Sequence, residues 1–214
     1  MNRIETTADI ADGLTALARI DPRLGRIIDV SGDIPLRRRT PGFEGLIRIV
    51  VSQQVSVASA EAIWTRLAAL VVPFDAATVL AIPEPELKAV GLSTPKLKTL
   101  VATARTVAAG DIDLVAVADL APADAHRAMT ALHGIGPWTA DIFLLFCAGH
   151  PDIWPAGDLA LQAAVMDAFG LEARPPEKLC RTIADAWAPW RSVAARLFWA
   201  YYAVGRNGRE TLPV

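Results

Sequence analysis

Residues 132–140 read Leu-His-Gly-Ile-Gly-Pro-Trp-Thr-Ala, and they join two segments that have the pattern of helices. The first predicted helix covers about residues 123–132, and the second is a very apolar run that continues to about residue 148. Gly134 and Gly136 allow positive φ angles and a close approach of the backbone to another molecule. Pro137 can take the first helical position, where its missing N–H costs nothing. The stretch therefore predicts a tight turn between two helices.

The start of the second helix is a candidate anion site. Its first amides have no partner within the helix, and the helix dipole adds partial positive charge, so a phosphate can bind there. Ile135 is expected to anchor the turn in the core. Such a hairpin holds a DNA backbone without reading its sequence, because it offers main-chain donors and no base-edge contacts. The alternative is a turn that only changes the chain direction, with glycines needed for tight packing.

Helical patterns continue on both sides of this turn. Pro41 is expected to start a helix, Ser56 to cap the next one, and Thr94 to cap a third helix with Pro95 in its first position. The sequence contains no internal repeat, no low-complexity tract and no convincing alternation of a β-strand. The predicted fold is all-α, built from many short helices.

Composition limits the classes of protein that the chain can belong to. The 214 residues are 53% hydrophobic, which suits packed helices, but no apolar run approaches the roughly 18 residues of a membrane span. The N-terminus lacks the apolar stretch of a signal peptide, so we expect a cytoplasmic protein without a membrane partner. The Ala- and Arg-rich, Lys-poor composition is typical of a bacterial chain. A net charge of −2 is weak evidence against binding to nucleic acid.

The two cysteines, Cys147 and Cys180, are too few for a disulfide framework or a four-thiolate metal cluster. Both lie in apolar helical patterns and are expected to be buried.

Four segments together resemble one known family. The hairpin at 132–140 is followed by Gly149-His150-Pro151 and by Trp-Pro-Ala-Gly-Asp at 154–158, twenty residues after Trp138. Ile-Val-Val-Ser-Gln-Gln-Val-Ser at 49–56 and Trp-Ala-Pro-Trp-Arg-Ser at 187–192 complete the set. These motifs resemble those of the DNA-3-methyladenine glycosylase II family, within the helix-hairpin-helix DNA glycosylases, over about residues 41–202.

The resemblance implies two helical lobes with the active site in the cleft between them. One lobe would span residues 37–148, with the helix-hairpin-helix at about 123–148. The other would combine residues 1–36 with 149–214. The sequence lacks the N-terminal α/β domain of longer members and the cysteines of iron–sulfur branches, so no cluster and no cofactor are expected. The expected state is a monomer.

Asp158 is the predicted catalytic carboxylate. Breaking an N-glycosidic bond develops positive charge on the sugar, which a carboxylate in a water-poor site stabilises. Asp158 also precedes an apolar helix, so its alternative role is that of a helix cap. The two roles can coexist, because amides at a helix start favour the carboxylate form.

The resemblance also assigns residues to a base pocket. The damaged nucleotide must swing out of the duplex, and Trp138 and Trp199 would line the pocket that receives its base. Aromatic faces suit an alkylated purine, because this base carries positive charge. Ile142 stands where longer members have tyrosine, so the pocket is less aromatic than theirs.

Further residues are expected at the DNA. By resemblance, Gln54, preceded by Gln53, would fill the space that the flipped base leaves, and an ordinary surface glutamine is the alternative. His133 is expected either to touch a phosphate or to face solvent. The hairpin backbone residues Gly134, Ile135 and Gly136 would contact phosphate. No side-chain metal site is predicted, but the main-chain carbonyls of Thr130, Leu132 and Ile135 could hold a monovalent cation, as in relatives.

The resulting hypothesis is a base-excision repair enzyme that acts on damaged double-stranded DNA. It would flip out 3-methyladenine and 7-methylguanine and hydrolyse the glycosidic bond. Strand cleavage needs an amine nucleophile, and bifunctional relatives carry a lysine where this chain has Trp138. The enzyme is therefore expected to be monofunctional and to leave an abasic site in an intact strand. Excision of uracil or an oxidised base, and a non-catalytic DNA-binding module, are the alternatives.

Overall fold

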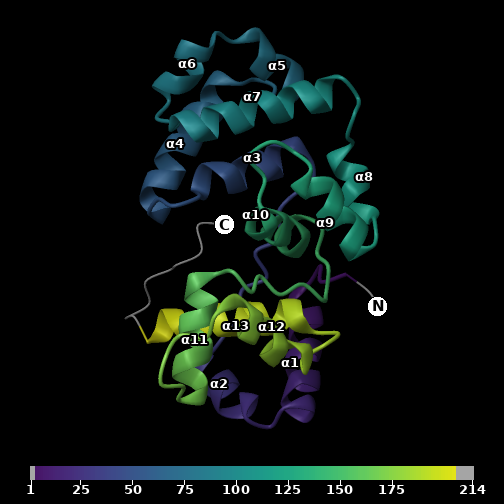
Figure 1. The fold of residues 1–214 in the computed structure, drawn as a ribbon, viewed down its shortest axis with the longest axis vertical. Coiled ribbons are helices and arrows are strands. Elements are labelled where there is room, and N and C mark those ends of the chain that lie inside the picture. The colour runs from purple at the N-terminus through teal and green to yellow at the C-terminus, as the bar shows by residue number, and fades with distance from the viewer. Residues whose placement is uncertain (1–2, 206–214) are drawn as a thin grey trace. The chain divides into compact units, whose positions relative to one another are not determined.

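The structure, a computed structural model, describes residues 3–205, and every regular element in that range is a helix (Figure 1). The predicted all-α fold is therefore confirmed. The chain divides into two compact units, one combining residues 3–38 with 149–205 and the other running from Arg39 to Ala148. We call them the terminal unit and the central unit. Residues 1–2 and 206–214 of the predicted second lobe lie outside the described range. Within it, no helix has the length and apolar character to cross a membrane.

The terminal unit is built around one buried helix. Its helices are α1 (Thr7–Ile20), α2 (Leu24–Ser31), α11 (Leu159–Phe169), α12 (Glu177–Asp185) and α13 (Arg191–Val204). Helix α13 packs against α1, α2 and α11, so the purple and yellow ends of the chain lie side by side in this unit (Figure 1). Residues 192–199 are all buried. A helix buried on all sides is the centre of its unit rather than part of its surface.

Both ends of α1 are fixed by side chains. At its start, the Thr6 hydroxyl accepts a hydrogen bond from the Asp9 amide while the Asp9 carboxylate accepts one from the Thr6 amide. At its end, the buried Asp21 accepts two hydrogen bonds from the Arg23 guanidinium, at 2.7 and 2.8 Å, and one from the Trp187 indole at 3.1 Å. These bonds hold the pKa of Asp21 below its ordinary value of 3.8, with Arg23 as the main cause.

The central unit holds the other helices: α3 (Phe43–Ser52), α4 (Val57–Leu70), α5 (Ala76–Ala81), α6 (Glu84–Ala89), α7 (Thr94–Ala108), α8 (Leu114–Asp119), α9 (Pro122–Thr130), α10 (Pro137–Ile142) and η1 (Phe143–Cys147). Helix α7 packs against α3, α5 and α6. The core of the central unit includes Ile47, Trp64, Leu67, Leu87 and Leu100, which are all buried.

Two predicted helix starts are wrong by one or two residues. Helix α3 begins at Phe43 and not at Pro41, because Gly42 has a φ of 115° that no α-helix contains. Helix α7 is preceded by Ser93, whereas Thr94 and Pro95 are its first two residues. Proline is tolerated throughout the first helical turn, so it does not fix the exact start. The predicted cap at Ser56 is confirmed, because its hydroxyl accepts from the Ser59 amide at 3.2 Å.

The apolar helix after the hairpin changes its type along its length. It starts as α10 and continues as a π-helical segment, η1, whose residues are all buried. The Ala148 amide accordingly donates to the Phe143 carbonyl, five residues earlier. Cys147, in this segment, and Cys180 are both buried, as expected, and burial raises the pKa of the Cys180 thiol.

Candidate active site

The two hairpin glycines have different structural roles. Gly134 has a φ of 79°, and a Cβ added there would lie 1.9 Å from the Thr99 hydroxyl oxygen of α7. Any larger residue would therefore strain the backbone and collide with α7. Gly136 has a φ of −89°, and an added Cβ would meet no atom within 4 Å. Nothing inside the protein requires glycine at Gly136, so its small size leaves room for an approaching molecule.

Gly136 is also the N-cap of α10, and it supplies no side chain to the first amides of that helix. Pro137 follows it at the first helical position, as the sequence predicted. Ile135, between the two glycines, is buried, and its amide donates to the Leu132 carbonyl at 3.1 Å. The hairpin thus presents a fixed backbone with an uncapped helix start.

The turn after α3 is attached to the hairpin helix. The Gln53 side-chain amide donates to the Thr139 hydroxyl of α10 at 2.7 Å. On the other side of the turn, the Lys96 ammonium of α7 donates to the Val51 carbonyl at 2.7 Å, and burial lowers the pKa of Lys96. Gln54 is exposed and has a φ of 55°, in the left-handed region. The hydrogen bonds of Gln53 and Lys96 therefore fix the backbone of the turn, on which Gln54 is exposed.

The other predicted residues of the central unit differ in exposure. His133 is exposed, Trp138 is half-buried in the first turn of α10, and Ile142 is completely buried. The Leu132 carbonyl, although bonded to the Ile135 amide, retains a second lone pair. A monovalent cation at this carbonyl and at those of Thr130 and Ile135 stays a prediction. Among the described residues, no group of three or more His, Cys, Asp or Glu side chains could hold a metal ion.

Asp158 caps α11 in the terminal unit, as one of its two predicted roles requires. Its Oδ1 atom accepts hydrogen bonds from the Ala160 amide at 3.0 Å and from the Leu161 amide at 2.9 Å. The same oxygen accepts the indole N–H of Trp199 at 3.2 Å. Three donors on one oxygen fix the orientation of the carboxylate.

Asp158 lies just below the surface. Its own exposed fraction is 9%, whereas Leu159 on one side is 61% exposed and Gly157 on the other side is exposed as well. A fixed carboxylate in this position can stabilise positive charge on a molecule that approaches the start of α11, because few waters screen it.

The structure brings the predicted site residues together in two groups. Asp158 and Trp199 are in contact in the terminal unit, and the Gln53 turn is bonded to the hairpin helix in the central unit. The predicted cleft between the lobes remains a prediction, as do the roles of these residues toward DNA.

Several residues that hold the Asp158 loop were not identified from the sequence. The buried Gln162 amide donates to the Ala156 carbonyl at 2.8 Å, and Ser192 bonds to the backbone of the same loop at Ile153. The sequence marks residues 187–192 as part of the family resemblance but assigns them no physical role. The likeness of this segment to the family motif was the available signal for Ser192, but its contact with Ile153 joins residues 39 positions apart.

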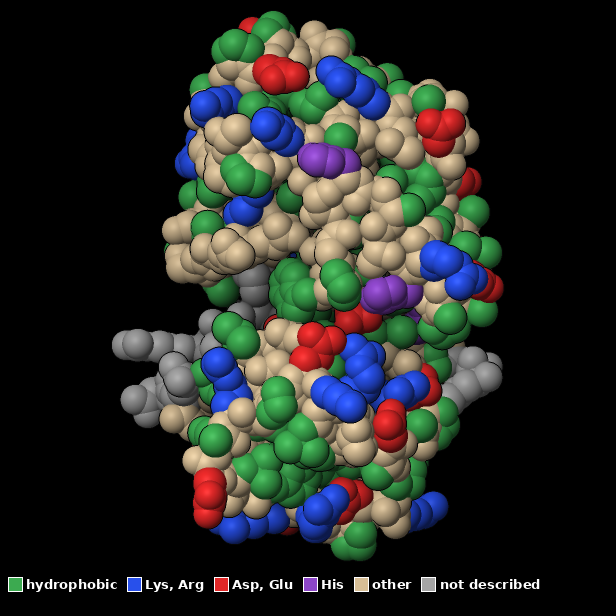
Figure 2. Space-filling model, viewed as in Figure 1, with side chains coloured by type: hydrophobic (Ala, Val, Ile, Leu, Met, Phe, Trp, Pro, Cys, Tyr) green, Lys and Arg blue, Asp and Glu red, His purple; other side chains and the backbone are tan. Residues whose placement is uncertain are grey.

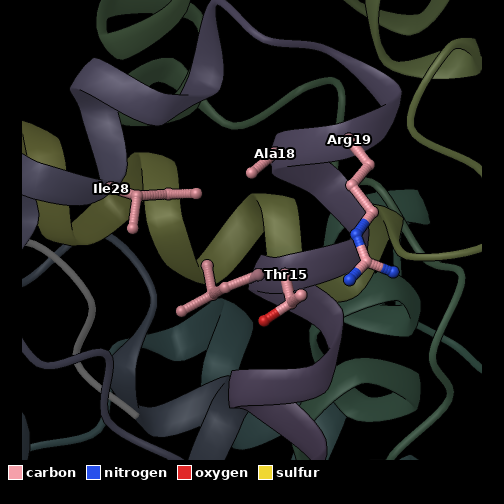
Figure 3. Close-up of a pocket in the computed structure, with 5 residues that line it drawn as sticks. Thr15, Ala18, Arg19 and Ile28 are labelled. Carbon is pink, nitrogen blue, oxygen red and sulfur yellow. The ribbon is translucent and has the colours of Figure 1, made fainter.

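Two further surface features of the described residues lie outside these groups. Figure 2 shows Lys and Arg side chains spread among neutral polar surface over the α4, α6 and α7 side of the central unit. A hollow of about 410 Å³ lies between α1 and α2 and is lined by Leu14, Thr15, Ala18, Arg19 and Ile28; Figure 3 shows it in close-up. Its lining holds one charged group and no carboxylate or nucleophilic thiol, and it includes none of the predicted site residues.

Comparison with known proteins identifies related chains. The model of the HhH-GPD superfamily of base excision DNA repair proteins matches residues 47–189. DNA-3-methyladenine glycosylase 1 of Schizosaccharomyces pombe is 26% identical over 92% of this chain and 91% of its own length. DNA-3-methyladenine glycosylase 2 of Escherichia coli is 28% identical over 84% of this chain and 64% of its own length. The chain spans 42% of a related Bacillus subtilis protein and 37% of one from Mycobacterium tuberculosis.

Solved structures show the same fold. The Schizosaccharomyces pombe 3-methyladenine DNA glycosylase, in complex with abasic DNA, has a TM-score of 0.80 at 23% identity and covers 90% of this chain and 95% of that chain. A DNA-3-methyladenine glycosidase from Bacillus halodurans has a TM-score of 0.78 at 26% identity and covers 92% of this chain and 91% of its own.

Proposed function

The chain belongs to the HhH-GPD superfamily of base excision DNA repair proteins, and from this premise we propose that it is a monofunctional DNA glycosylase for alkylated purines. Its substrates are 3-methyladenine and 7-methylguanine in double-stranded DNA. The observation that carries the proposal is the arrangement at Asp158, a carboxylate with one oxygen fixed by three donors at the start of α11. The names of relatives, among them DNA-3-methyladenine glycosylases, support the choice of substrate.

Asp158 acts on the sugar. As the bond between C1′ and the base nitrogen lengthens, its electron pair moves to the base and positive charge develops on the deoxyribose. The Asp158 carboxylate stabilises this charge and orients the attacking water, whose oxygen bonds to C1′ and whose proton is released. An alkylated purine already carries a positive charge, so it leaves as a neutral base without a strong general acid.

The central unit holds the DNA. The α10 start at Gly136 binds a backbone phosphate with main-chain amides, since no side chain occupies those donors. His133 lies on the same exposed loop. Gln54, held outward by the turn, fills the space left by the flipped nucleotide. Trp138 and Trp199 line the pocket that receives the flipped base, with Ile142 as a third pocket residue.

The product is an abasic site in an intact strand. A lyase step needs an amine that forms a Schiff base with C1′. The sequence has no lysine between Lys98 and Lys178, and Trp138 stands at the position next to the hairpin. We expect the protein to act as a monomer in the bacterial cytoplasm, where its partner is chromosomal DNA.

The test is release of free base from methylated duplex DNA by the wild type and by Asp158→Asn. Asparagine caps helices as well as aspartate does, so the variant should keep its fold and its affinity for DNA. We expect its rate of 3-methyladenine release to fall on the order of 10²–10³-fold, the range seen when a charge-stabilising group is removed. Strand breaks should appear only after treatment with alkali.

Each other outcome has a distinct meaning. Equal activity of the two proteins would show that Asp158 does not carry the chemistry. No release of methylated base by the wild type, with release from DNA containing uracil or 8-oxoguanine, would assign another lesion. DNA binding without release from any of these substrates would leave a non-catalytic binding module.

A further inference from the structure

Ser192, at the start of α13, forms hydrogen bonds with the loop that leads to Asp158, residues 149–157. The hydroxyl of Ser192 donates to the His150 carbonyl at 2.6 Å and accepts from the Ile153 amide at 2.9 Å. The Ser192 amide donates to the Pro151 carbonyl at 3.0 Å. The side chain of Ser192 is completely buried. One small residue therefore satisfies three backbone groups of a loop that has no helix or strand of its own.

The neighbouring residue on α13 secures the same loop from its outer side. The Arg191 guanidinium donates to both carboxylate oxygens of Asp152, at 2.7 and 2.8 Å. This pairing raises the pKa of Arg191. A two-point contact between arginine and carboxylate fixes direction as well as distance.

The middle of the loop rests on α13 through an aromatic contact. The Trp154 ring meets the Phe198 ring edge-on, with centroids 5.9 Å apart, and it also meets the Trp187 ring at 5.2 Å. Trp154 and Phe198 are both buried. The loop thus gains a third attachment, at the middle of the same helix.

Helix α13 then contacts the carboxylate itself. Trp199, whose indole N–H donates to Asp158 Oδ1, lies seven residues after Ser192. Seven residues make two helical turns, so the two side chains lie on one face about 10.5 Å apart along the axis. One buried helix, α13, therefore contacts both the start of the loop, through Ser192, and the carboxylate at its end, through Trp199.

We propose that Ser192 is a positioning residue for Asp158, and that α13 sets the place of the carboxylate by holding the loop at Ser192 and the Oδ1 atom at Trp199. This inference rests on the proposed function. Ser192 touches no reacting atom and acts only through the loop and Asp158. Loss of its hydroxyl leaves the His150 carbonyl and the Ile153 amide without their partner in a buried place, and the loop must shift to recover them.

The test compares Ser192→Ala with Ser31→Ala. Ser31 is a buried serine of the same unit, but its hydroxyl bonds only to its own helix, at the Ile27 carbonyl. Base release is measured in single turnover with saturating enzyme, at a temperature where each variant is folded. Affinity for an abasic-site duplex is measured separately. We expect Ser192→Ala to slow base release about 10- to 100-fold, because small displacements of a reacting group have effects of this size. Its affinity should stay within about twofold of the wild type, and Ser31→Ala should match the wild type in both.

A double variant separates positioning from general damage. If Ser192 acts through Asp158, adding Ser192→Ala to Asp158→Asn should cause no further loss of the residual rate, whereas independent effects would multiply. Arg191→Gln provides a milder change at the half-exposed outer contact and should slow release about three- to tenfold.

The outcomes distinguish this inference from the proposed function. Wild-type rates in Ser192→Ala and Arg191→Gln, or multiplied losses in the double variant, would overturn the positioning role while the glycosylase activity stands. A wild type that releases no base would overturn the proposed function and this inference with it.

Discussion

Helices α10 and α11 begin in opposite ways. The start of α10 has Gly136 as its cap, no side-chain bond to its first amides, and open space around it. The start of α11 has Asp158, whose carboxylate occupies the first amides and also meets Trp199. An uncapped start offers positive partial charge to an anion, whereas a start capped by a carboxylate presents negative charge. In the proposed function, the first holds the phosphate and the second faces the sugar.

The largest effect is expected from a substitution that adds a side chain inside the hairpin turn, at Gly134. Gly134→Ala should lower the free energy of unfolding of the protein by roughly 2–4 kcal/mol, because the new Cβ adds backbone strain at positive φ to a collision with Thr99. Gly136→Ala, with open space and a negative φ, should cost less than about 1 kcal/mol. Urea unfolding measures both.

Thr99→Ala in the Gly134→Ala background serves as the control. It removes the colliding oxygen, so it should recover part of the loss, while the strain and a tight contact with the remaining Cβ, 3.0 Å away, persist. Equal destabilisation by Gly134→Ala and Gly136→Ala would contradict the assignment of different roles to the two glycines.

The second change makes α10 resemble α11. Gly136→Asp should cap α10 and place negative charge where the phosphate is proposed to bind, and so weaken binding to duplex DNA about tenfold, or about 1.4 kcal/mol. The effect should shrink as salt is added. Fluorescence anisotropy at several salt concentrations measures it. Gly136→Asn, which caps without charge, is the matched control, and an equal loss in both variants would point to bulk rather than charge.

The third change removes the cap of α11. Asp158→Ala and Asp158→Asn should both lose activity, but only the alanine variant should lose the bonds to the Ala160 and Leu161 amides. We expect Asp158→Ala to be less stable than Asp158→Asn by about 1 kcal/mol, the usual contribution of an N-cap. Thermal unfolding of the two variants gives the difference, and equal stability would mean that the cap contributes nothing to the fold.

The smallest effect concerns a carboxylate at the unfavourable end of a helix. Asp21 ends α1, where the dipole disfavours negative charge, yet the Arg23 guanidinium holds its pKa below 3.8. A lowered pKa means that Asp21 stabilises the folded state above pH 4 and that this contribution is lost as pH falls through the folded-state pKa. Asp21→Asn should therefore show a shallower loss of stability than the wild type between about pH 4 and 2. Unfolding followed across this range measures the two slopes, and identical slopes would contradict the assignment.

Local features of this structure could be predicted from the sequence, and contacts between distant segments could not. Ser56 and Asp158 were identified as caps because a cap depends only on residues two or three positions away. The start of α7 was misplaced because Ser93 and Thr94 are both suitable caps and the choice depends on packing. The π-helical segment η1 could not be predicted, because its residues are uniformly apolar and suit an α-helix equally well.

The site was predicted in the same uneven way. Asp158 and Trp199 were both identified through a family resemblance, but the indole was assigned only an aromatic face. Its bond to the carboxylate joins residues 41 positions apart in sequence, and it depends on how α11 packs against α13. Ser192 was part of a recognised motif, yet its three bonds to the loop could be assigned only from the fold.

Selection for a stable fold does not by itself preserve the Asp158 carboxylate. Asparagine can accept the same two amide bonds at the start of α11, and natural proteins tolerate substitutions that leave stability above its threshold. A descendant could therefore lose the chemistry through one substitution and keep its structure and its hold on DNA. Such a chain would continue to find damaged sites without processing them and would be free to evolve as a marker of damage.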